Sequence, residues 1–519
     1  MKKRILLLPV MLLFICFSIF PQENEPSELT EESTLQVESS DYNNDSIFVI
    51  NSFVFDVDGI TLPFVMVNKA ELKKGEEIAG LPNLTKYLDD KQQLLVNERV
   101  LETVRIEHYI GQKREDGKFP VDLVIHVKDT LNIMAIPRPQ YSSNSGFDIT
   151  IKARDYNFLG TMNPLRVDLG YQYDEYGQNF FTFMIDSGIP FEAFGLNWFF
   201  DFDHRFNYRP DLSQPYYYKN ETGLSVELPI DRTTLSIGFE ESLTYNEENS
   251  EGDWPLNGQF QDGLYMSSYP YISWKIPTGL EISEYGELTY TPEFSAKFNH
   301  ELSPWPLDRI RRGAFLYFSH SLGFGRTDWI GNFRKGYSFS VSNSFDYSFY
   351  SKSIGSEPLS AYYNITGKGY FIVSDFFGVS SRIIFRNWIN TASDNGGDVL
   401  RGVMDNHLYI DYMLSINLDL TLRIFKFRPS EWFKTQKMRF FNFDLHLGPI
   451  IDAAFSHDPR TGTIYGFNNL NVTGGLEMII FPISFRSLYL RISAATDVYR
   501  MLASDRGPIE IFIGTDLHY

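Results

Sequence analysis

Cysteine is almost absent from this sequence of 519 residues, and the single thiol, Cys16, lies in an apolar segment at the N-terminus. Disulfides and cysteine-ligated metal sites are therefore excluded for the rest of the chain. Long hydrophobic runs are also missing beyond about residue 20. A bundle of membrane-spanning helices needs several runs of roughly 20 apolar residues, so this class of protein is excluded.

Positive charge is scarce and scattered. The chain has 46 Lys and Arg against 66 Asp and Glu, which gives a formal charge of −20. Binding to a phosphate backbone needs clustered basic side chains, so we expect no nucleic acid partner. Aromatic residues, in contrast, make up 16% of the chain, although its mean hydropathy is −0.22. Disordered chains are depleted in aromatic residues, so we expect a folded protein.

Signatures of catalysis and metal binding are missing as well. No Gly-x-Ser-x-Gly motif occurs, and His300 and Glu301 do not continue as a His-Glu-x-x-His zinc motif. Asp56 and Asp58 begin like a calcium loop but lack the rest of its ligands. A barrel phospholipase would have only nine scattered histidines to draw on. We expect no enzyme activity, no cofactor and no bound metal.

The N-terminal segment is typical of export. Lys2, Lys3 and Arg4 precede an apolar run from Ile5 to Phe20, which predicts a secretory signal peptide over residues 1–22. An uncleaved helical anchor is the alternative, and a lipoprotein is disfavoured because the neighbours of Cys16 are not small. Residues 23–45 have eight acidic and no basic side chains, which predicts a solvated tether.

Residues 46–129 have the pattern of a small α+β module. Ile47 to Phe55 is β-like, and Leu84 to Val100 has apolar residues at helical spacing. Two alternating runs, Val104 to Ile110 and Val121 to Val127, flank a turn at Glu115 to Gly117. This pattern predicts a β-hairpin with one buried face. The expected order is strand, helical region, strand, strand.

Residues 130–519 consist of strand-like runs of about six to fifteen residues, such as Leu165 to Tyr173, separated by polar loops. Many runs end in an aromatic residue, as expected for girdles at the two interfaces of a membrane. We therefore predict a mainly β fold: a transmembrane antiparallel β-barrel of about 16 strands, within a range of 16 to 18, preceded by the small α+β module. A soluble sandwich or propeller is the alternative, but no internal repeats support it.

Several short motifs occur in one order along the chain. Ser143 to Gly146 and then Asp155, Asn157 and Gly160 follow the small module. Leu400, Arg401, Gly402 and Val403 come after a Gly-rich stretch and precede five strand-like runs. Asp452 lies at the centre of Ile450 to Ala454. The chain ends with Gly514, Leu517 and Tyr519 in a Gly-x-x-apolar-x-aromatic pattern.

In this order, residues 46–519 resemble the outer-membrane protein assembly superfamily, whose members include BamA and TamA. The resemblance implies that residues 46–129 form a polypeptide-transport-associated (POTRA) domain and that Asp155, Asn157 and Gly160 belong to the first barrel hairpins. It also implies a loop lock, in which Leu400, Arg401 and Gly402 enter the lumen and meet Asp452 on the wall. Gly514, Leu517 and Tyr519 would form the C-terminal strand signal. The sequence departs from the family at Val403, Ile450 and Ala454, where the family has an aromatic residue, Phe and Gly.

The pairing of Arg401 with Asp452 also has a physical basis. A charge that is shielded from water needs a partner, and a carboxylate can accept two hydrogen bonds from one guanidinium group. An acidic side chain on the lipid face would be costly, so Asp452 should face inward. The alternative is a solvated loop arginine and an aspartate that faces lumen water.

Pro137 and Pro139 lie in the segment expected to form the first barrel strand. Residues two apart in a strand direct their N–H groups to the same neighbour, so both missing donors lie on one edge. The seam with the final strand, Ile509 to Tyr519, could then be under-bonded and open sideways. The alternative is that the prolines merely end the linker before the barrel.

These expectations lead to a function. The resemblance implies an insertion and assembly factor, or a protein translocator, of the bacterial outer membrane, with its POTRA domain in the periplasm. Unfolded outer-membrane or secreted clients would bind at the POTRA strand edge and leave through the barrel seam. Other expected partners are the lipid bilayer and periplasmic chaperones or assembly lipoproteins. The alternatives are a two-partner-type secretion pore for one passenger and a passive porin-like barrel.

Overall fold

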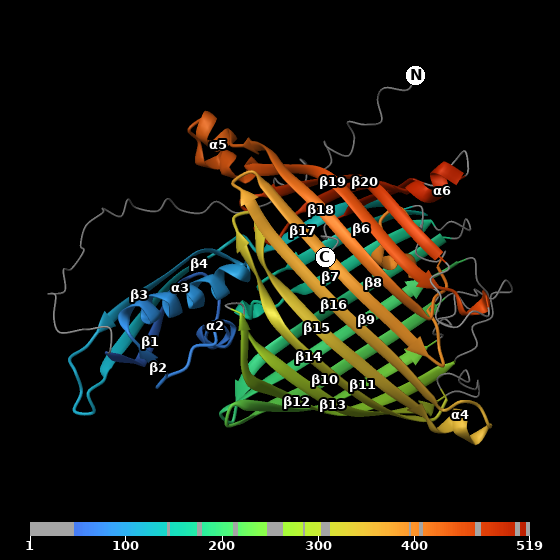
Figure 1. Ribbon diagram of the computed structural model, residues 1–519, viewed down its shortest axis with the longest axis horizontal. Coiled ribbons are helices and arrows are strands. Elements are labelled where there is room, and N and C mark those ends of the chain that lie inside the picture. The colour runs from blue at the N-terminus through green and yellow to red at the C-terminus, as the bar shows by residue number, and fades with distance from the viewer. Residues whose placement is uncertain are drawn as a thin grey trace.

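The computed structural model describes residues 46–142, 146–173, 179–210, 216–245, 263–283, 286–302, 312–393, 396–403, 408–461, 469–503 and 509–514. The predicted signal peptide (1–22), the acidic tether (23–45), Ser143 to Ser145, Leu517 and Tyr519 lie outside the described residues. A small α+β sheet lies at one end of a large β-barrel (Figure 1).

The small domain follows the predicted order, with a short helix and a short strand added between the first strand and the long helix. Its elements are β1 (Ile47–Asp58), α2 (Pro63–Lys69), β2 (Glu77–Ala79), α3 (Leu81–Asn97), β3 (Leu101–Ile110) and β4 (Phe119–Asp129). The strand order is β2-β1-β4-β3, in which β1 and β4 are parallel and the other two pairs are antiparallel. The predicted hairpin is confirmed as β3 and β4.

One face of this sheet packs against α3. Val121 and Val127 mark the ends of the alternating run in β4, and every second side chain between them is buried. Leu84, Leu88 and Leu95 are the buried positions of α3 that meet this core. Helical spacing on one element and alternation on the other therefore produce complementary apolar faces. None of the helices in the described residues has the length and apolar character needed to cross a lipid bilayer.

The barrel contains eighteen strands within the described residues, and each strand pairs with its neighbours in sequence. Its strands are β5 (Ile133–Ser142), β6 (Gly146–Asp155), β7 (Leu165–Tyr173), β8 (Asn179–Ala193), β9 (Leu196–Tyr208), β10 (Tyr216–Ile230), β11 (Thr233–Tyr245), β12 (Leu264–Ser283), β13 (Gly286–Glu301), β14 (Ala314–Ile330), β15 (Phe333–Ser348), β16 (Leu359–Ser374), β17 (Phe377–Ile389), β18 (Tyr412–Phe427), β19 (Phe443–His457), β20 (Asn469–Pro482), β21 (Leu490–Asp497) and β22 (Ile509–Gly514). The last strand, β22, lies beside the first, β5, and closes the barrel.

The number of strands is larger than the expected value of about 16. That value assumed about 24 residues for each strand with its connection. Several connections are only two residues long, as at Phe194–Gly195, Asp231–Arg232 and Gly331–Asn332. Because these turns consume so little chain, the same length forms two more strands.

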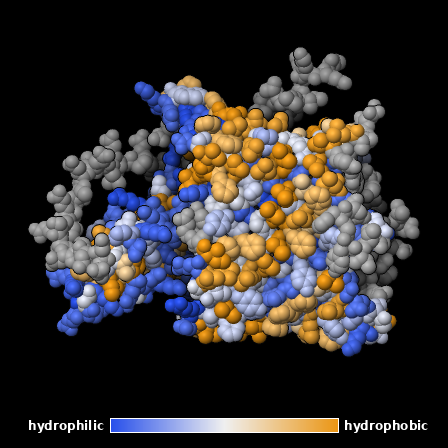
Figure 2. All heavy atoms as spheres, in the orientation of Figure 1, coloured by the Kyte–Doolittle hydropathy of each residue, from blue (hydrophilic) through white to orange (hydrophobic). Residues whose placement is uncertain are grey.

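The two faces of the barrel wall differ in polarity. Apolar residues are exposed on the outside (Figure 2), including Ile151, Leu169, Phe183, Phe294, Leu316, Ile383, Ile416 and Leu476. Polar residues are buried on the inside, including Ser415, Asn417, Asp452, Asn471 and Thr473. This alternation is the reverse of a soluble sandwich core, and it explains a high aromatic content at negative mean hydropathy.

The two ends of the barrel carry different connections. The end beside the small domain has several two-residue turns, the connections 156–164 and 483–489, and a longer connection, residues 428–442, with α5 (Pro429–Trp432) and the 3-10 helix η5 (Gln436–Phe441). The opposite end has α4 (Phe349–Ser353) and α6 (Val498–Ala503) (Figure 1). The connection between β17 and β18 also starts at this opposite end and contains the 3-10 helix η3 (Gly396–Val399).

Candidate functional site: the loop lock, the joint and the seam

The connection between β17 and β18 packs against the inner wall of the barrel. Leu400 and Val403 are buried in an apolar cluster with Ile384 of β17, Met413 of β18 and Ala454 of β19. The loop thus supplies apolar side chains both before and after its arginine. This apolar base inside the lumen fixes the position of the arginine between them.

The structure brings Arg401 and Asp452 together. The Nε and Nη2 atoms of Arg401 donate to the two carboxylate oxygens of Asp452 at 3.0 and 2.6 Å. The backbone N–H of Arg401 donates to the same carboxylate at 2.8 Å. Arg401 is only 5% exposed and Asp452 only 1%. A fork-to-fork pair in a site shielded from water has strong directional bonds and a fixed geometry.

Two further carboxylates meet the same guanidinium group. Asp419 of β18 lies 2.6 Å from Nη2 of Arg401, and Glu477 of β20 lies 3.6 Å from Nη1. Glu477 also pairs with Arg491 of β21 at 3.3 Å. We call Arg401, Asp419, Asp452, Glu477 and Arg491 the lumen cluster. One loop residue thus connects three adjacent strands of the wall.

The sequence around Asp419 also indicates that this side chain faces the lumen, although local pattern does not single it out as a partner of Arg401. Ser415, Asn417 and Asp419 alternate with apolar residues along β18, so the acidic side chain has to face the lumen. Glu477 stands among apolar residues in β20 in the same way as Asp452 does in β19. The argument that placed Asp452 inward applies equally to both, but it does not tell which of them reaches Arg401.

Burial lowers the pKa of Arg401, but the hydrogen bond to Asp452 and the charges of Asp419 and Glu477 outweigh that effect and raise the pKa above its ordinary value. The guanidinium group is therefore charged at every physiological pH. It neutralises carboxylates that would otherwise repel one another at close range. The loop is held by charge as well as by apolar packing.

Gly402 allows the loop to touch the wall. Its φ is 91°, a backbone conformation that favours glycine. A Cβ atom at this position would lie 2.6 Å from the backbone nitrogen of Thr496 in β21. The N–H of Gly402 also donates to the carboxylate of Glu510 in β22. A side chain at this position would clash with the wall, so the loop requires glycine here.

The loop backbone is also bonded to the wall on its other side. The carbonyl oxygen of Val399 accepts hydrogen bonds from Asn417 Nδ2 at 2.8 Å and from Arg382 Nη2 at 3.3 Å. Arg382 in turn donates to Asn417 Oδ1 at 2.9 Å. With Glu510 and the lumen cluster, these bonds connect the loop to strands from β17 to β22.

Asp155 ends β6, and Asn157 and Gly160 lie in the turn between β6 and β7, which the structure places against the small domain. Asn157 is fully buried, and its Nδ2 donates to Thr61 Oγ1 at 2.7 Å and to Asp129 Oδ2 at 3.1 Å. Asp129 also accepts a hydrogen bond from the backbone N–H of Thr61 at 3.2 Å. We call Thr61, Asp129, Asn157 and Gly160 the joint.

Gly160 completes the joint through its backbone. Its carbonyl oxygen accepts a hydrogen bond from Leu62 N at 2.9 Å, and its φ is 75°. A Cβ atom there would lie 2.1 Å from the carbonyl oxygen of Ile60. Asp155 stands at the start of the turn, where its Oδ1 accepts a hydrogen bond from Asn157 N at 3.1 Å. The three motif residues thus fix the small domain to the barrel.

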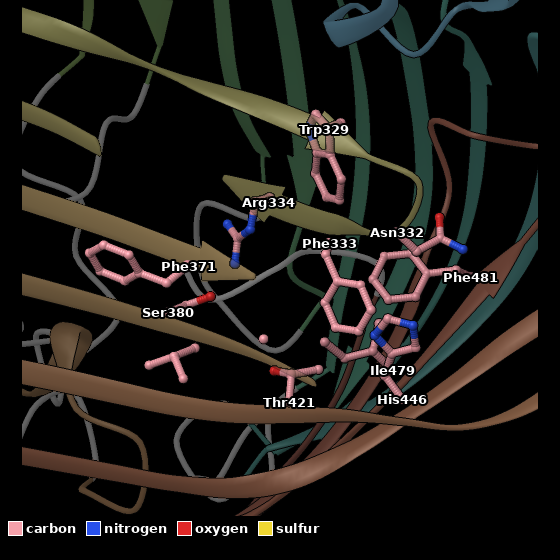
Figure 3. Close-up of a pocket in the computed structure, with 12 residues that line it drawn as sticks. Trp329, Asn332, Phe333, Arg334, Phe371, Ser380, Thr421, His446, Ile479 and Phe481 are labelled. Atoms are coloured by element: carbon pink, nitrogen blue, oxygen red, sulfur yellow. The ribbon is translucent and has the colours of Figure 1, made fainter. Parts of the chain in front are cut away.

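An aromatic pocket lies inside the barrel at the end that carries the small domain. Phe333, His446 and Phe481 line it, and the ring of His446 lies 4.7 Å from Phe333 and 4.8 Å from Phe481 (Figure 3). Trp329 lines the same pocket, and Arg99 of the small domain lies 4.1 Å from its ring. The small domain therefore reaches the rim of the aromatic pocket.

Arg99 follows α3 and contacts the barrel through backbone groups as well. Its guanidinium group donates to the carbonyl oxygens of Arg486 and Gly331, and its own carbonyl oxygen accepts a hydrogen bond from Ser487 Oγ at 3.0 Å. Burial lowers the pKa of Arg99 to about 10. The side chain is still charged at neutral pH, and it bridges two turns of the barrel rim.

Further contacts surround Arg99. Asn97 Nδ2 donates to Asp328 Oδ1 at 2.8 Å, and Asp90 lies 2.7 Å from Arg326. On the other side, Arg439 of η5 pairs with Glu102 of β3. The small domain is thus held to the barrel at the joint, at β14 and at the long connection after β18.

Pro137 and Pro139 lie within β5, opposite Ile151 and Ile149 of β6. The carbonyl oxygen of Asn132 accepts a hydrogen bond from Tyr156 N of the chain after β6 at 2.9 Å, in the same register. Backbone groups alternate between the two neighbours of a strand. Both prolines are an odd number of positions from Asn132, so their missing N–H groups fall on the edge that faces β22.

Side chains also meet across this seam. The guanidinium group of Arg138 lies 5.9 Å from the ring of Phe512 in β22. A Cβ atom on Gly514, the described member of the C-terminal signal, would lie 2.4 Å from Arg138 Nη2. Leu517 and Tyr519 follow it outside the described residues. The seam thus has a cation–π contact where two backbone donors are missing.

The described residues contain no group of three or more His, Cys, Asp or Glu side chains placed to share a metal ion. The candidate site consists of the lumen cluster, the joint and the seam. Its chemistry is that of ion pairs, hydrogen bonds and packing.

No protein-family model matches the sequence, and neither does any curated protein sequence. Among solved structures, the chain is similar to CdiB from Acinetobacter baumannii, with 12% identity, 90% of this chain and 73% of that chain covered, and a TM-score of 0.46. BamA from Haemophilus ducreyi lacking POTRA domains 1–3 matches with 12% identity, 90% and 83% coverage, and a TM-score of 0.36. CdiB from Escherichia coli matches with 9% identity, 94% and 92% coverage, and a TM-score of 0.38. BamA, a named member of the superfamily that the motifs resemble, is among these structures, and the likeness concerns the fold alone.

Proposed function

We propose that this protein inserts other proteins into the bacterial outer membrane or translocates them across it. The observation that carries the proposal is the lumen cluster, in which Arg401 from a long loop is held by carboxylates of three wall strands. A loop fixed in this way occupies part of the lumen, which disfavours free diffusion of solutes as the main activity. The joint, which fixes a small α+β domain at the barrel mouth, supports the same function.

The barrel would lie in the outer membrane with the small domain in the periplasm. The many apolar side chains exposed on the outer wall favour this placement, because such a surface is costly in water and stable in lipid. Residues 1–22 as a signal peptide and residues 23–45 as a tether agree with export.

The small domain (46–129) would act as a POTRA domain. Its sheet ends at β2, which has three residues, and at β3, which has ten. An unfolded client could add a strand to such an edge, because main-chain hydrogen bonds bind a peptide with little dependence on its sequence. Chaperones or assembly lipoproteins would deliver clients to the same domain.

The barrel (130–519) would release the client at the seam between β5 and β22. Pro137 and Pro139 remove two backbone donors from this edge, so fewer hydrogen bonds oppose its opening. The energy would come from the folding and lipid burial of the client, and the proposal includes neither a cofactor nor enzymatic chemistry. Arg401 and Asp452 would hold strands β18 to β20, on the β22 side of the seam, while the seam opens.

Depletion of the protein, followed by quantification of all outer-membrane and secreted proteins, tests this function. We expect a broad loss of outer-membrane proteins, with re-expression of the wild type restoring them and re-expression of Arg401→Ala restoring them less. Loss of one secreted protein would instead identify a two-partner-type exporter. An unchanged outer membrane would identify a porin-like barrel and overturn the proposal.

A further inference from the structure

The connection between β18 and β19 differs from the other connections at its end of the barrel. It has fifteen residues, 428–442, where several described turns at this end have two. We call these residues the arm. Its helix α5 projects at the barrel rim on the side of the small domain (Figure 1). A long, structured connection at this rim requires a physical reason.

The arm continues the apolar outer wall of the barrel. Phe427 and Phe443 are register partners at the ends of β18 and β19, and their rings stack at 4.9 Å. Their neighbours Lys426 and Asp444 form the next pair, and Asp444 is buried beside Asn332 on the inner side. Alternation therefore directs the two phenylalanines outward, toward the lipid-facing side.

Two aromatic side chains extend this surface beyond the strand ends. Trp432 contacts Phe427 edge-on at a ring distance of 5.0 Å. Trp432 and Phe433 nevertheless remain 55% and 65% exposed. Large aromatic side chains seldom remain so exposed without a partner surface, and at the level of a membrane interface such rings are favourable.

The arm is also a local concentration of positive charge in a chain with a formal charge of −20. It has four basic residues and one acidic residue, Glu431. Two of the basic residues are paired with carboxylates outside the arm, Arg428 with Asp444 and Arg439 with Glu102. These two pairs fix the arm to the wall and to the small domain.

The other two basic residues of the arm are lysines. Lys434 and Lys437 are exposed, and within the described part of the chain neither has an ion-pair partner. Two ammonium groups beside exposed aromatic rings form a surface that is complementary to lipid phosphates.

The base of the arm is rigid. Asn442 Nδ2 donates to Ser430 Oγ at 2.7 Å, and Asn442 Oδ1 accepts from Ser430 N at 3.3 Å. The ring of Phe440 packs edge-on against Phe485 at 5.0 Å. Lys434 has a φ of 49°, a left-handed backbone conformation that residues with a Cβ atom seldom adopt. The exposed side chains are thus presented in a fixed geometry.

We propose that the arm binds the membrane leaflet on the small-domain side of the barrel. Trp432 and Phe433 lie at the boundary between headgroups and acyl chains, and Lys434 and Lys437 bind phospholipid phosphates. The inference rests on the proposed placement of the barrel in the outer membrane. Because Arg439 of the arm pairs with Glu102, the arm also relates the small domain to the membrane surface.

Depth-dependent quenching tests this contact in proteoliposomes. Because Cys16 is the only cysteine, Cys16→Ser with Thr435→Cys gives one site for an environment-sensitive fluorophore beside the four side chains. Vesicles contain phosphatidylcholine alone or with phosphatidylglycerol, together with lipids that have nitroxides in the headgroup or the acyl chain. A label at Ile424→Cys on the outer wall reports insertion of the barrel, and one at Glu115→Cys on the small-domain hairpin reports the aqueous phase.

We expect the label at residue 435 to be quenched most by headgroup nitroxides, and more strongly when phosphatidylglycerol is present. The double variant Lys434→Gln with Lys437→Gln should no longer respond to phosphatidylglycerol. Each lysine should change the equilibrium constant between the bound and the free arm by about fivefold. The pair Trp432→Ser and Phe433→Ser should expose the label in both kinds of vesicle.

Two results would overturn the inference. Both can be distinguished from the result expected if the barrel does not lie in the membrane. If residue 424 is quenched and residue 435 behaves like residue 115, the barrel is in the membrane and the arm does not touch the leaflet; a protein partner would then be the occupant. If phosphatidylglycerol has no effect on residue 435, phosphate binding is wrong. If residue 424 itself is not quenched, the placement of the barrel in the membrane fails first.

Discussion

Arg401 contacts residues that lie far apart in the sequence. Its side chain pairs with residues of β18, β19 and β20, and its neighbour Gly402 meets β21 and β22. Removing one partner of a buried charged group costs far more than the pair contributes, because the other charges remain without compensation. The loop and three strands of the wall therefore depend on one guanidinium group.

Arg401→Ala should destabilise the folded barrel by about 3–5 kcal/mol. The folded and unfolded forms can be separated on a gel in detergent after heating. We expect Arg401→Ala to convert to the unfolded form at a clearly lower temperature than the wild type. Arg401→Lys keeps the charge but loses the fork geometry. Its unfolding temperature should therefore lie between those of Arg401→Ala and the wild type.

The matched control is Arg386→Ala, because Arg386 pairs with Asp398 of the same loop at 2.9 Å but is less buried. This variant should unfold near the wild-type temperature, since exposed pairs contribute about 0–1 kcal/mol. Equal unfolding temperatures for Arg401→Ala and the wild type would contradict the role assigned to the lumen cluster.

Among the structural elements, those with strong local patterns could be predicted from the sequence. Alternation around an Asp-Gly turn predicted β3 and β4, and β7 has the bounds Leu165–Tyr173 that its pattern predicts. α3 begins at Leu81, three residues before the expected position, because Pro82 is favourable in a first helical turn. β2 was not expected, since three residues carry no periodic signal.

The partners of Asn157 and Gly160 could not be predicted from local pattern. The motif indicated the first barrel hairpins, but the residues that these two positions meet come from the small domain: Thr61 and Asp129 for Asn157, and Ile60 and Leu62 for Gly160. No spacing in the sequence encodes such a contact, because it depends on how two separately folded sheets meet. The contact of Glu477 with Arg401 could not be predicted for the same reason.

Gly160→Ala should weaken the joint, because the new Cβ atom would lie 2.1 Å from Ile60 O. Gly195→Ala is the control, since Gly195 has a similar positive φ of 73° but no atom within 4 Å of an added Cβ. Both variants suffer backbone strain of about 1 kcal/mol, and only the first has the clash.

Limited proteolysis at the segment between β1 and α2 measures the difference. We expect Gly160→Ala to be cleaved faster than the wild type, and Gly195→Ala to be cleaved at the wild-type rate there. The same cleavage rate in both variants would show that the joint does not hold the small domain.

At the scale of the whole molecule, the orientation of the small domain should depend on pH. Burial raises the pKa of Glu102, but the hydrogen bond and charge of Arg439 outweigh burial, so the pKa is lower than usual. A carboxylate with a lowered pKa in the docked state stabilises docking fully above its ordinary pKa. That contribution is lost as the pH falls through the lowered value.

Spin labels at Glu115→Cys and Phe194→Cys can follow this change as a distance distribution between the small domain and a barrel turn. We expect a narrow distribution at neutral pH and a broader one in acid, with a smaller change in Glu102→Gln. Other carboxylates at the interface titrate in both the wild type and Glu102→Gln. The difference in pH dependence between the two proteins therefore measures the contribution of Glu102. Identical pH dependence in the two proteins would refute this prediction.

The central claim is that the barrel handles client proteins at the seam between β5 and β22. The most direct measurement is client insertion by proteoliposomes in which a disulfide joins these two strands, with cysteines placed within Ile133–Arg138 and Ile509–Gly514. A disulfide between the register partners Ile492 and Ile513 of β21 and β22 is the matched control. The account predicts that the seam disulfide stops insertion and that reductant restores it, while the control stays active. Undiminished insertion by the fully oxidised seam variant would contradict it.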